Sequence, residues 1–136
     1  MLPIMPATIN FKRIDGNEIL QGSDWYIEMT LVDRVDGVDT PIKLTGYTGT
    51  CKIRENATSE TTVAEPTITI LDGVGGSFSI SLSEIETAAI PTTGLTHKEV
   101  TRYQYEVQLD DGNGGIYRAL QGYVEVSPTV IKDEVL

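Results

Sequence analysis

Residues 101–128 have the sequence TRYQYEVQLDDGNGGIYRALQGYVEVSP, which predicts a β-hairpin. In its first arm apolar and polar residues alternate, so each set faces one side of a sheet. The apolar set is Tyr103, Tyr105, Val107 and Leu109, and the polar set is Arg102, Gln104, Glu106 and Gln108. The turn at residues 110–115 contains Gly and Asn, which accept the positive φ that a tight reversal needs.

The second arm, residues 116–126, is interrupted by Gly122. A glycine inside a strand marks a bulge or a close approach of another backbone segment. Pro128 has no N–H to donate to a neighbouring strand, so we expect the strand to end there.

The same alternation predicts short strands elsewhere in the chain, at residues 7–13, 24–33, 47–54, 67–71 and 77–83. In residues 47–54 the alternation turns Lys52 and Arg54 outward, with Cys51 and Ile53 facing inward. We expect the following side chains to lie in the core: Trp25, Ile27, Met29, Tyr105 and Val107.

Residues 83–90 are the one segment that favours a helix. Ser83 and Glu86 have the spacing of a capping box, and Pro91 stops the helix. We expect Ile85, Ala88 and Ala89 to form its apolar stripe.

Together these elements predict an all-β fold, an antiparallel immunoglobulin-like β-sandwich with one short helical turn. We divide the chain into an extended N-terminal arm at residues 1–6, the sandwich at 7–128 and a C-terminal tail at 129–136. Prolines give the arm an extended shape, and we expect it to be poorly ordered alone or to lie on a neighbouring subunit.

Composition restricts the possible functions. The 136 residues carry 20 Asp and Glu against 10 Lys and Arg, a formal charge of −10, which disfavours binding to nucleic acid. A single cysteine precludes an intramolecular disulfide and fits a reducing compartment. The sequence has no apolar run long enough to span a membrane, and its start lacks the basic region of a signal peptide.

Few residues suggest chemistry. Asp33, Asp36 and Asp39 could in principle bind calcium, but their spacing differs from an EF-hand loop, so we expect a solvated acidic hairpin loop at residues 34–41. Cys51 is expected to be a small core residue, and His97 has no catalytic or metal-binding partners in a recognisable arrangement. We therefore assign no catalytic, cofactor-binding or metal-binding residue and expect no enzyme activity.

Four blocks in order resemble the immunoglobulin-like domains of tailed-phage virion proteins, in particular the N-terminal domain of the baseplate upper protein family. The blocks are GSDWYIEMTLVD (22–33), PIKLTGYTGTCKIR (41–54), GSFSISLS (76–83) and RYQYEVQLDDGNGGIYRALQGYVEVSPTV (102–130). The chain departs from that family by ending soon after Val130, without a coiled-coil or receptor-binding extension, so its position could be baseplate, tail, neck or head surface.

The resemblance implies a non-enzymatic virion structural protein, a baseplate, tail or neck adaptor made in the bacterial host cytoplasm. Its partners would be other phage structural proteins and copies of itself, with no nucleic acid, membrane or cofactor. Two alternatives remain open, a head decoration protein and a carbohydrate-binding or adhesive module. The adhesive alternative requires exposed aromatic residues, for which the candidates are Tyr26, Tyr47, Tyr117 and Tyr123.

Overall fold

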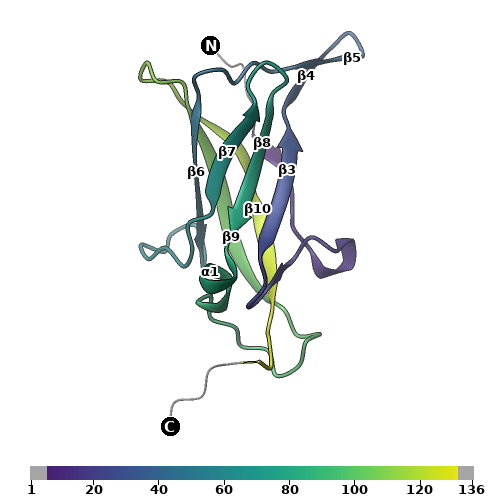
Figure 1. Cartoon of the computed structure of the whole chain (residues 1–136), viewed down its shortest axis with the longest axis vertical. Coiled ribbons are helices and arrows are strands. Elements are labelled where there is room, and N and C mark those ends of the chain that lie inside the picture. Colours follow the sequence, from purple (N-terminus) through teal and green to yellow (C-terminus); the bar gives the residue numbers. More distant parts are fainter. Residues whose placement is uncertain (1–5, 132–136) are drawn as a thin grey trace.

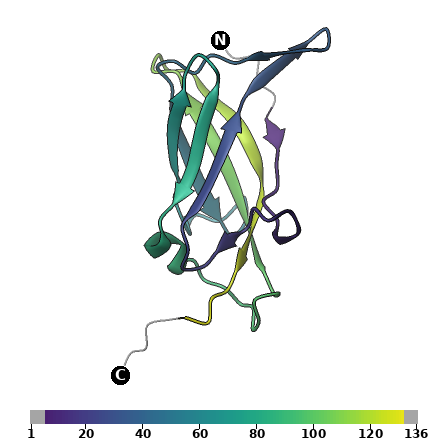
Figure 2. The same cartoon turned by 45° about the vertical axis from the view of Figure 1, so that its right-hand side comes forward.

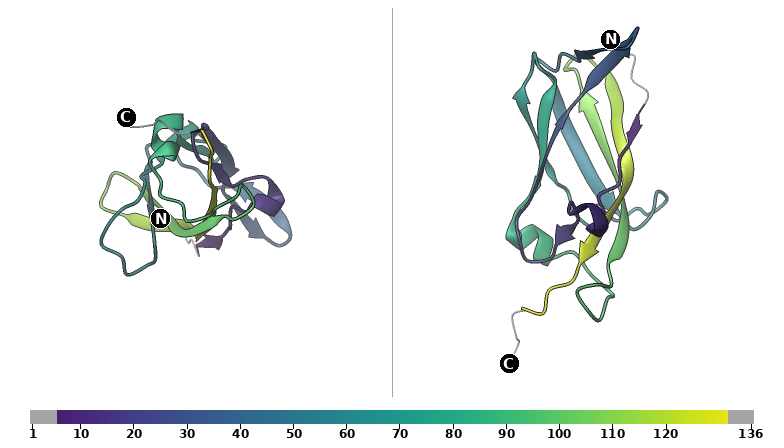
Figure 3. Two further views of the ribbon diagram at one scale, coloured as in Figure 1. Left: turned by 90° about the horizontal axis from the view of Figure 1, so that it is seen from below. Right: turned by 90° about the vertical axis from the view of Figure 1, so that its right-hand side faces the viewer.

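A computed structural model describes residues 6–131 of the chain. Two sheets face each other as the layers of a sandwich (Figures 1 and 3). The larger sheet contains β1 (Ala7–Thr8), β2 (Ile19–Leu20), β6 (Thr48–Arg54), β9 (Thr101–Asp110) and β10 (Ile116–Ser127). The smaller sheet contains β3 (Trp25–Thr30), β7 (Thr67–Asp72) and β8 (Ser77–Leu82). The predicted all-β sandwich is confirmed.

The strand order brings distant parts of the chain side by side. In the larger sheet the order is β1-β10-β9-β6, with β2 also beside β10, and in the smaller sheet it is β3-β8-β7. Both β1 and β2 run parallel to β10, whereas the other pairs are antiparallel. The two short first strands thus lie beside the last strand, and the sequence-distant β6 lies beside β9, as in a Greek-key sandwich.

The core lies between the sheets and follows the predicted alternation. Trp25, Tyr105 and Val107 are buried, while Ile27 and Met29 are half-buried and pack against the core. The completely enclosed large side chains include Phe11, Leu44, Ile53, Phe78, Ile80, Ile90, Leu109, Leu120 and Val124. The central hairpin is confirmed as β9 and β10, and β10 ends at Ser127, immediately before Pro128.

At Gly122 the N-terminal segment, which runs alongside β10, approaches this strand closely. The φ of Gly122 is 151°, and an added Cβ would lie 2.3 Å from the Ile9 carbonyl oxygen. The sequence left a bulge and a close approach open; the structure gives the close approach at Gly122 and puts the β-bulge between Arg118 and Leu120. The N-terminal segment is held there because the Ile9 N–H donates to the Gln121 carbonyl at 3.0 Å.

Three local predictions are corrected. Residues 7–13 do not form one strand, because β1 ends at Thr8, Phe11 makes an isolated bridge to Val124, and a 3₁₀ helix, η1, follows at Arg13–Asp15. The strand predicted at residues 24–33 breaks at Leu31, whose N–H donates to the Gly76 carbonyl at 2.9 Å and whose carbonyl accepts from Ile42 at 2.9 Å.

The third correction concerns residues 34–41, where a second hairpin has a turn of only two residues in place of the longer acidic hairpin loop that we expect. Its strands are β4 (Val32–Val35) and β5 (Val38–Pro41), joined by Asp36 and Gly37. Both turn residues have positive φ, 51° and 77°, as the favoured two-residue hairpin turn requires. All the side chains of this hairpin are exposed, so it stands clear of the sandwich at its upper end (Figures 1 and 2).

The helix forms where predicted, and its apolar stripe lies on the exposed side. Helix α1 (Glu84–Ala88) has the predicted capping box, in which the Glu86 N–H donates to Ser83 Oγ at 3.2 Å and the Ser83 N–H donates to Glu86 Oε1 at 2.9 Å. Ile85, Ala88 and Ala89 are exposed, whereas Thr87 is buried and donates from Oγ1 to the Ser23 carbonyl at 2.9 Å. The stripe is therefore presented to solvent, next to the end of β10.

Candidate functional site

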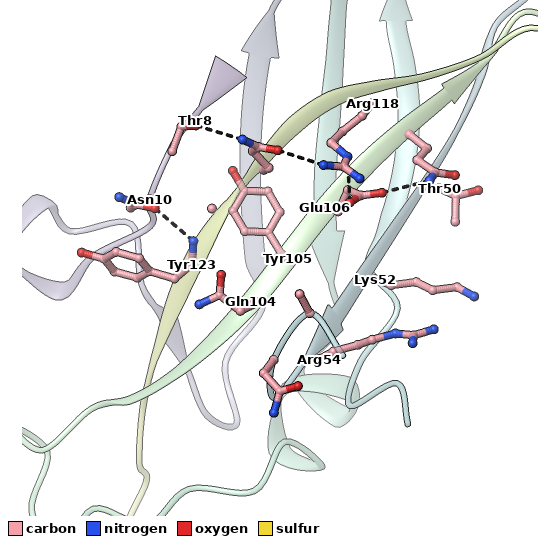
Figure 4. A pocket seen from close by; sticks show the side chains of 15 residues that line it. Thr8, Asn10, Thr50, Lys52, Arg54, Gln104, Tyr105, Glu106, Arg118 and Tyr123 are labelled. Carbon is pink, nitrogen blue, oxygen red and sulfur yellow. Dashed lines mark hydrogen bonds and ion pairs between the residues drawn. The ribbon is translucent and has the colours of Figure 1, made fainter. Parts of the chain in front are cut away.

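The outward side of the larger sheet forms a polar hollow, which we call the concave face (Figure 4). Alternating residues of β6, β9 and β10 supply its floor, and it has a volume of about 840 Å³. Thr8 and Asn10 border it on one side, and Asn56 and Ala57 of the loop after β6 border it on the other. The lining also includes Thr50, Lys52, Arg54, Gln104, Glu106, Gln108, Arg118, Gln121 and Tyr123.

A chain of polar contacts crosses the concave face and fixes its side chains. Arg118 pairs with Glu106 at 2.9 Å between Nε and Oε1 and donates to Gln121 Oε1 at 3.3 Å. Gln108 donates to Glu106 at 2.9 Å, and Gln121 donates to Thr8 Oγ1 at 3.3 Å. These bonds tie β1, β10 and β9 together through their side chains, so a ligand would meet a largely preformed surface.

The concave face is basic although the chain is acidic. Its lining contains Lys52, Arg54 and Arg118 but a single carboxylate, Glu106, whereas the whole chain has a formal charge of −10. Arg54 donates to the Ser59 carbonyl at 2.5 Å. Among the side chains of residues 6–131, none forms an ion pair with Lys52, whose ammonium group is therefore available to an incoming carboxylate.

Two tyrosines line this face, Tyr105 and Tyr123, and the ring of Tyr123 is already in contact with a cation. The Arg102 guanidinium lies 3.9 Å above the centre of the Tyr123 ring and also pairs with Glu125 at 3.2 Å. One side of the ring that a sugar would stack on is therefore covered. The concave face offers amides, hydroxyls and cations more than it offers aromatic surface.

The four tyrosines predicted as candidates for adhesion do not gather on one surface. Tyr26 is 53% exposed on β3 of the smaller sheet, with its hydroxyl donating to Glu28 at 2.9 Å. Tyr47, Tyr117 and Tyr123 are half-buried, and of the four only Tyr123 lines the concave face. The structure therefore does not bring the predicted aromatic platform together.

A second surface lies at the lower end of the sandwich, and we call it the terminal patch. It consists of Ile85 and Ala88 of α1, Ala89 immediately after the helix, and Ile131 beyond the end of β10. These residues line a groove of about 750 Å³, and the side chains of Ile85 and Ile131 are 77% and 85% exposed. Thr129 is fixed beside it, because its N–H donates to Gln21 Oε1 at 3.0 Å.

The remaining candidates for chemistry are separated from one another. Cys51 is buried, and this burial raises its pKa to about 12, so the thiol stays protonated near neutral pH. His97 is exposed in the loop before β9, where its carbonyl accepts from Ser127 Oγ at 2.8 Å.

The three aspartates considered for calcium belong to the β4–β5 hairpin, where Asp39 is paired with Arg34 at 2.7 Å. Over residues 6–131, no three His, Cys, Asp or Glu side chains are grouped so that they could hold a metal ion. No helix in that part of the chain has the length and apolar character needed to cross a membrane.

Sequence reasoning identified most of the outward-facing residues of the concave face but not the face itself. The alternation put Gln104, Glu106, Lys52 and Arg54 on outer faces, as observed. The pairing of β6 with β9 brings Lys52 opposite Glu106. This pairing could not be deduced from the sequence, because β7 and β8 separate the two strands in the chain. No protein-family model matches the sequence, and a comparison with curated proteins finds no match.

Proposed function

We propose that this chain is a non-enzymatic structural protein of a tailed-bacteriophage particle, an adaptor of the baseplate, tail or neck that acts through protein–protein contacts. The order of the four sequence blocks that resemble phage immunoglobulin-like domains supports this role. The sandwich fold is compatible with it but is shared by many unrelated functions, so the argument depends on a surface.

The terminal patch is the observation that carries the proposal. It presents Ile85 and Ile131, both more than three-quarters exposed, in the lining of one groove. Burying a large aliphatic side chain contributes about 1.5–3 kcal/mol, so covering this pair would supply a substantial part of a subunit contact. We propose another structural subunit of the particle as the partner that covers it.

The test begins with mass spectrometry of purified virions from the phage that carries the gene, where we expect the chain as a stoichiometric component. A phage that lacks the gene is then complemented with Ile85→Lys and Ile131→Lys variants, which we expect to fold normally but to be lost from purified particles. Val74→Lys is the matched control, because Val74 is 65% exposed in the β7–β8 turn at the opposite end of the sandwich (Figure 1). Absence of the chain from virions, or normal incorporation of both patch variants, refutes the proposal.

A second candidate function is supported by the concave face. Its amide and hydroxyl groups can donate hydrogen bonds to sugar hydroxyls and accept them, so we retain a carbohydrate-binding or adhesive module as the alternative. A glycan array with the purified chain tests it. The alternative requires binding that is lost in a Gln104→Ala, Gln108→Ala double variant, since both amides lie on the floor of the hollow.

A further inference from the structure

The β4–β5 hairpin is a preformed element that extends away from the sandwich (Figures 1 and 2). Within the part of the chain that the structure describes, β4 and β5 pair only with each other. The two positive-φ residues at the turn, Asp36 and Gly37, set its shape, and Arg34 clamps Asp39 with bonds of 2.7 Å and 3.2 Å. The local sequence thus stabilises a ribbon that contributes nothing to the core.

This ribbon has features of a docking element. A two-stranded hairpin is only marginally stable in water without a surface to pack against. Val32, Val35 and Val38 are 46%, 56% and 63% exposed, although β-branched residues of this kind usually cover a core. Contact with a partner would bury these valines.

Charge indicates where the hairpin binds. It carries Asp33, Asp36 and Asp39 against Arg34, a formal charge of −2. The concave face, with three cations against one carboxylate, carries a formal charge of +2 and includes Lys52, which lacks an ion-pair partner among residues 6–131. From β1 at one border to β6 at the other, the larger sheet spans three strand spacings, about 15 Å, and a two-stranded ribbon with side chains occupies about 10 Å.

We propose that the β4–β5 hairpin of one copy of this chain docks into the concave face of a second copy. A second copy is the favoured occupant because both complementary surfaces belong to the same chain and are therefore always present in equal amounts. Asp33 has no ion pair within the described residues and would meet Lys52 of the neighbour.

The contact is head-to-tail, because the hairpin and the concave face are different parts of the surface. Such a heterologous contact closes into a ring when the rotation between copies permits and otherwise continues as a filament. The hairpin contact would join copies of this chain within the proposed particle, and it does not use the terminal patch. If the hairpin contact fails its test, the proposed role of the terminal patch is unaffected, and the reverse also holds.

A charge-swap experiment tests the contact with the purified full chain. Sedimentation velocity over a concentration series should detect self-association at about 0.1 M salt that weakens at about 1 M salt. Asp33→Lys and Lys52→Glu should each weaken it about tenfold or more. Mixing the two variants should restore association, with the two variants alternating in the product. The reason is that the hairpin of each variant attracts the concave face of the other, whereas each variant alone places like charges at the contact.

Matched controls change the same charges in the loop before β9. Glu99→Lys and Lys98→Glu, both exposed, should associate as the wild type does. Circular dichroism melts confirm that each variant is folded. A chain that stays monomeric at low salt, single variants that associate normally, or a mixture that fails to pair overturns the proposal; so does a wild-type concave face that binds a glycan through Lys52 without self-association.

Discussion

Trp25 connects the smaller sheet to the N-terminal segment across the core. Its indole meets the Phe11 ring edge-on, with centroids 5.3 Å apart and planes at 83°, and its Nε1 donates to the Asn17 carbonyl at 3.0 Å. We expect Trp25→Ala to lower the free energy of unfolding by about 3–5 kcal/mol, because it leaves a large cavity. Urea unfolding measures the change. Tyr26→Ala is the control on the exposed side of the same strand, and an equal effect of both substitutions would contradict this role.

The buried thiol of Cys51 makes the stability of the fold fall at alkaline pH. Burial raises its pKa from about 9 to about 12, so the folded state keeps a proton that the unfolded state releases. This contribution to stability is fully present below about pH 9 and is lost as the pH rises toward 12, at about 1.4 kcal/mol per pH unit. We therefore expect the free energy of unfolding of the Cys51→Val variant to fall less steeply with rising alkaline pH than that of the wild type.

Urea midpoints measured between about pH 8 and pH 11 check this expectation. Burial also raises the pKa of Tyr105, and the neighbouring Cys51 adds to that rise, so the difference between the two proteins reports the thiol together with its effect on Tyr105. Parallel curves would show that Cys51 titrates alike in the folded and unfolded chains.

Gly122 governs how the N-terminal element joins the larger sheet. A side chain there would collide with the Ile9 carbonyl oxygen, which also accepts a 2.6 Å bond from the Tyr105 hydroxyl. We expect Gly122→Ala to cost about 2–4 kcal/mol, through displaced backbone and a weakened buried hydrogen bond. Hydrogen exchange should show lost protection at the Ile9 and Phe11 amides, both of which donate to β10.

Gly114→Ala is the control that separates collision from backbone strain. Gly114 has a φ of 89° but no atom within 4 Å of an added Cβ, so only the strain applies, and we expect a cost of about 1 kcal/mol. Equal costs at both glycines would mean that the close approach to Ile9 adds nothing.

The sequence predicted the elements that adjacent residues determine, but it did not predict the features that depend on tertiary contacts. The alternation around Tyr103 and Val107 and the Ser83–Glu86 capping box are properties of adjacent residues, and both are confirmed. Periodicity groups Ile85 with Ala88 but does not say which side of the helix meets the core, and in the structure that role falls to Thr87.

The strands of the β4–β5 hairpin were missed for a different reason. Its Asp-Gly turn is a strong local signal, but the charges on both sides of the turn favour a solvated loop over strands. The concave face depends on which strands become neighbours, and that information is distributed over the whole chain.

At the scale of the whole molecule, the ends of the chain are predicted to serve assembly more than folding. Most of the N-terminal arm and residues 132–136 lie outside the described residues. Among the described residues of the C-terminal tail, Val130 and Ile131 are 76% and 85% exposed, so their side chains add little to the stability of the sandwich. Thr129 differs, because it is bonded to Gln21, and we therefore place the truncation after it.

We expect deletion of residues 1–5 and 130–136 to leave the melting temperature almost unchanged and to abolish incorporation into particles. Ordering a tail costs about 1–2 kcal/mol per residue, which nearly cancels the gain from its apolar side chains unless a partner covers them. Calorimetry and immunoblots of purified virions measure the two effects, and self-association through the hairpin should persist. A deletion that begins at Ser127 is the control, because it removes the buried Ser127 and Pro128 and should lower the melting temperature by several degrees. If the shorter truncation fails to fold, the ends belong to the sandwich; if it is incorporated normally, another surface makes the contact.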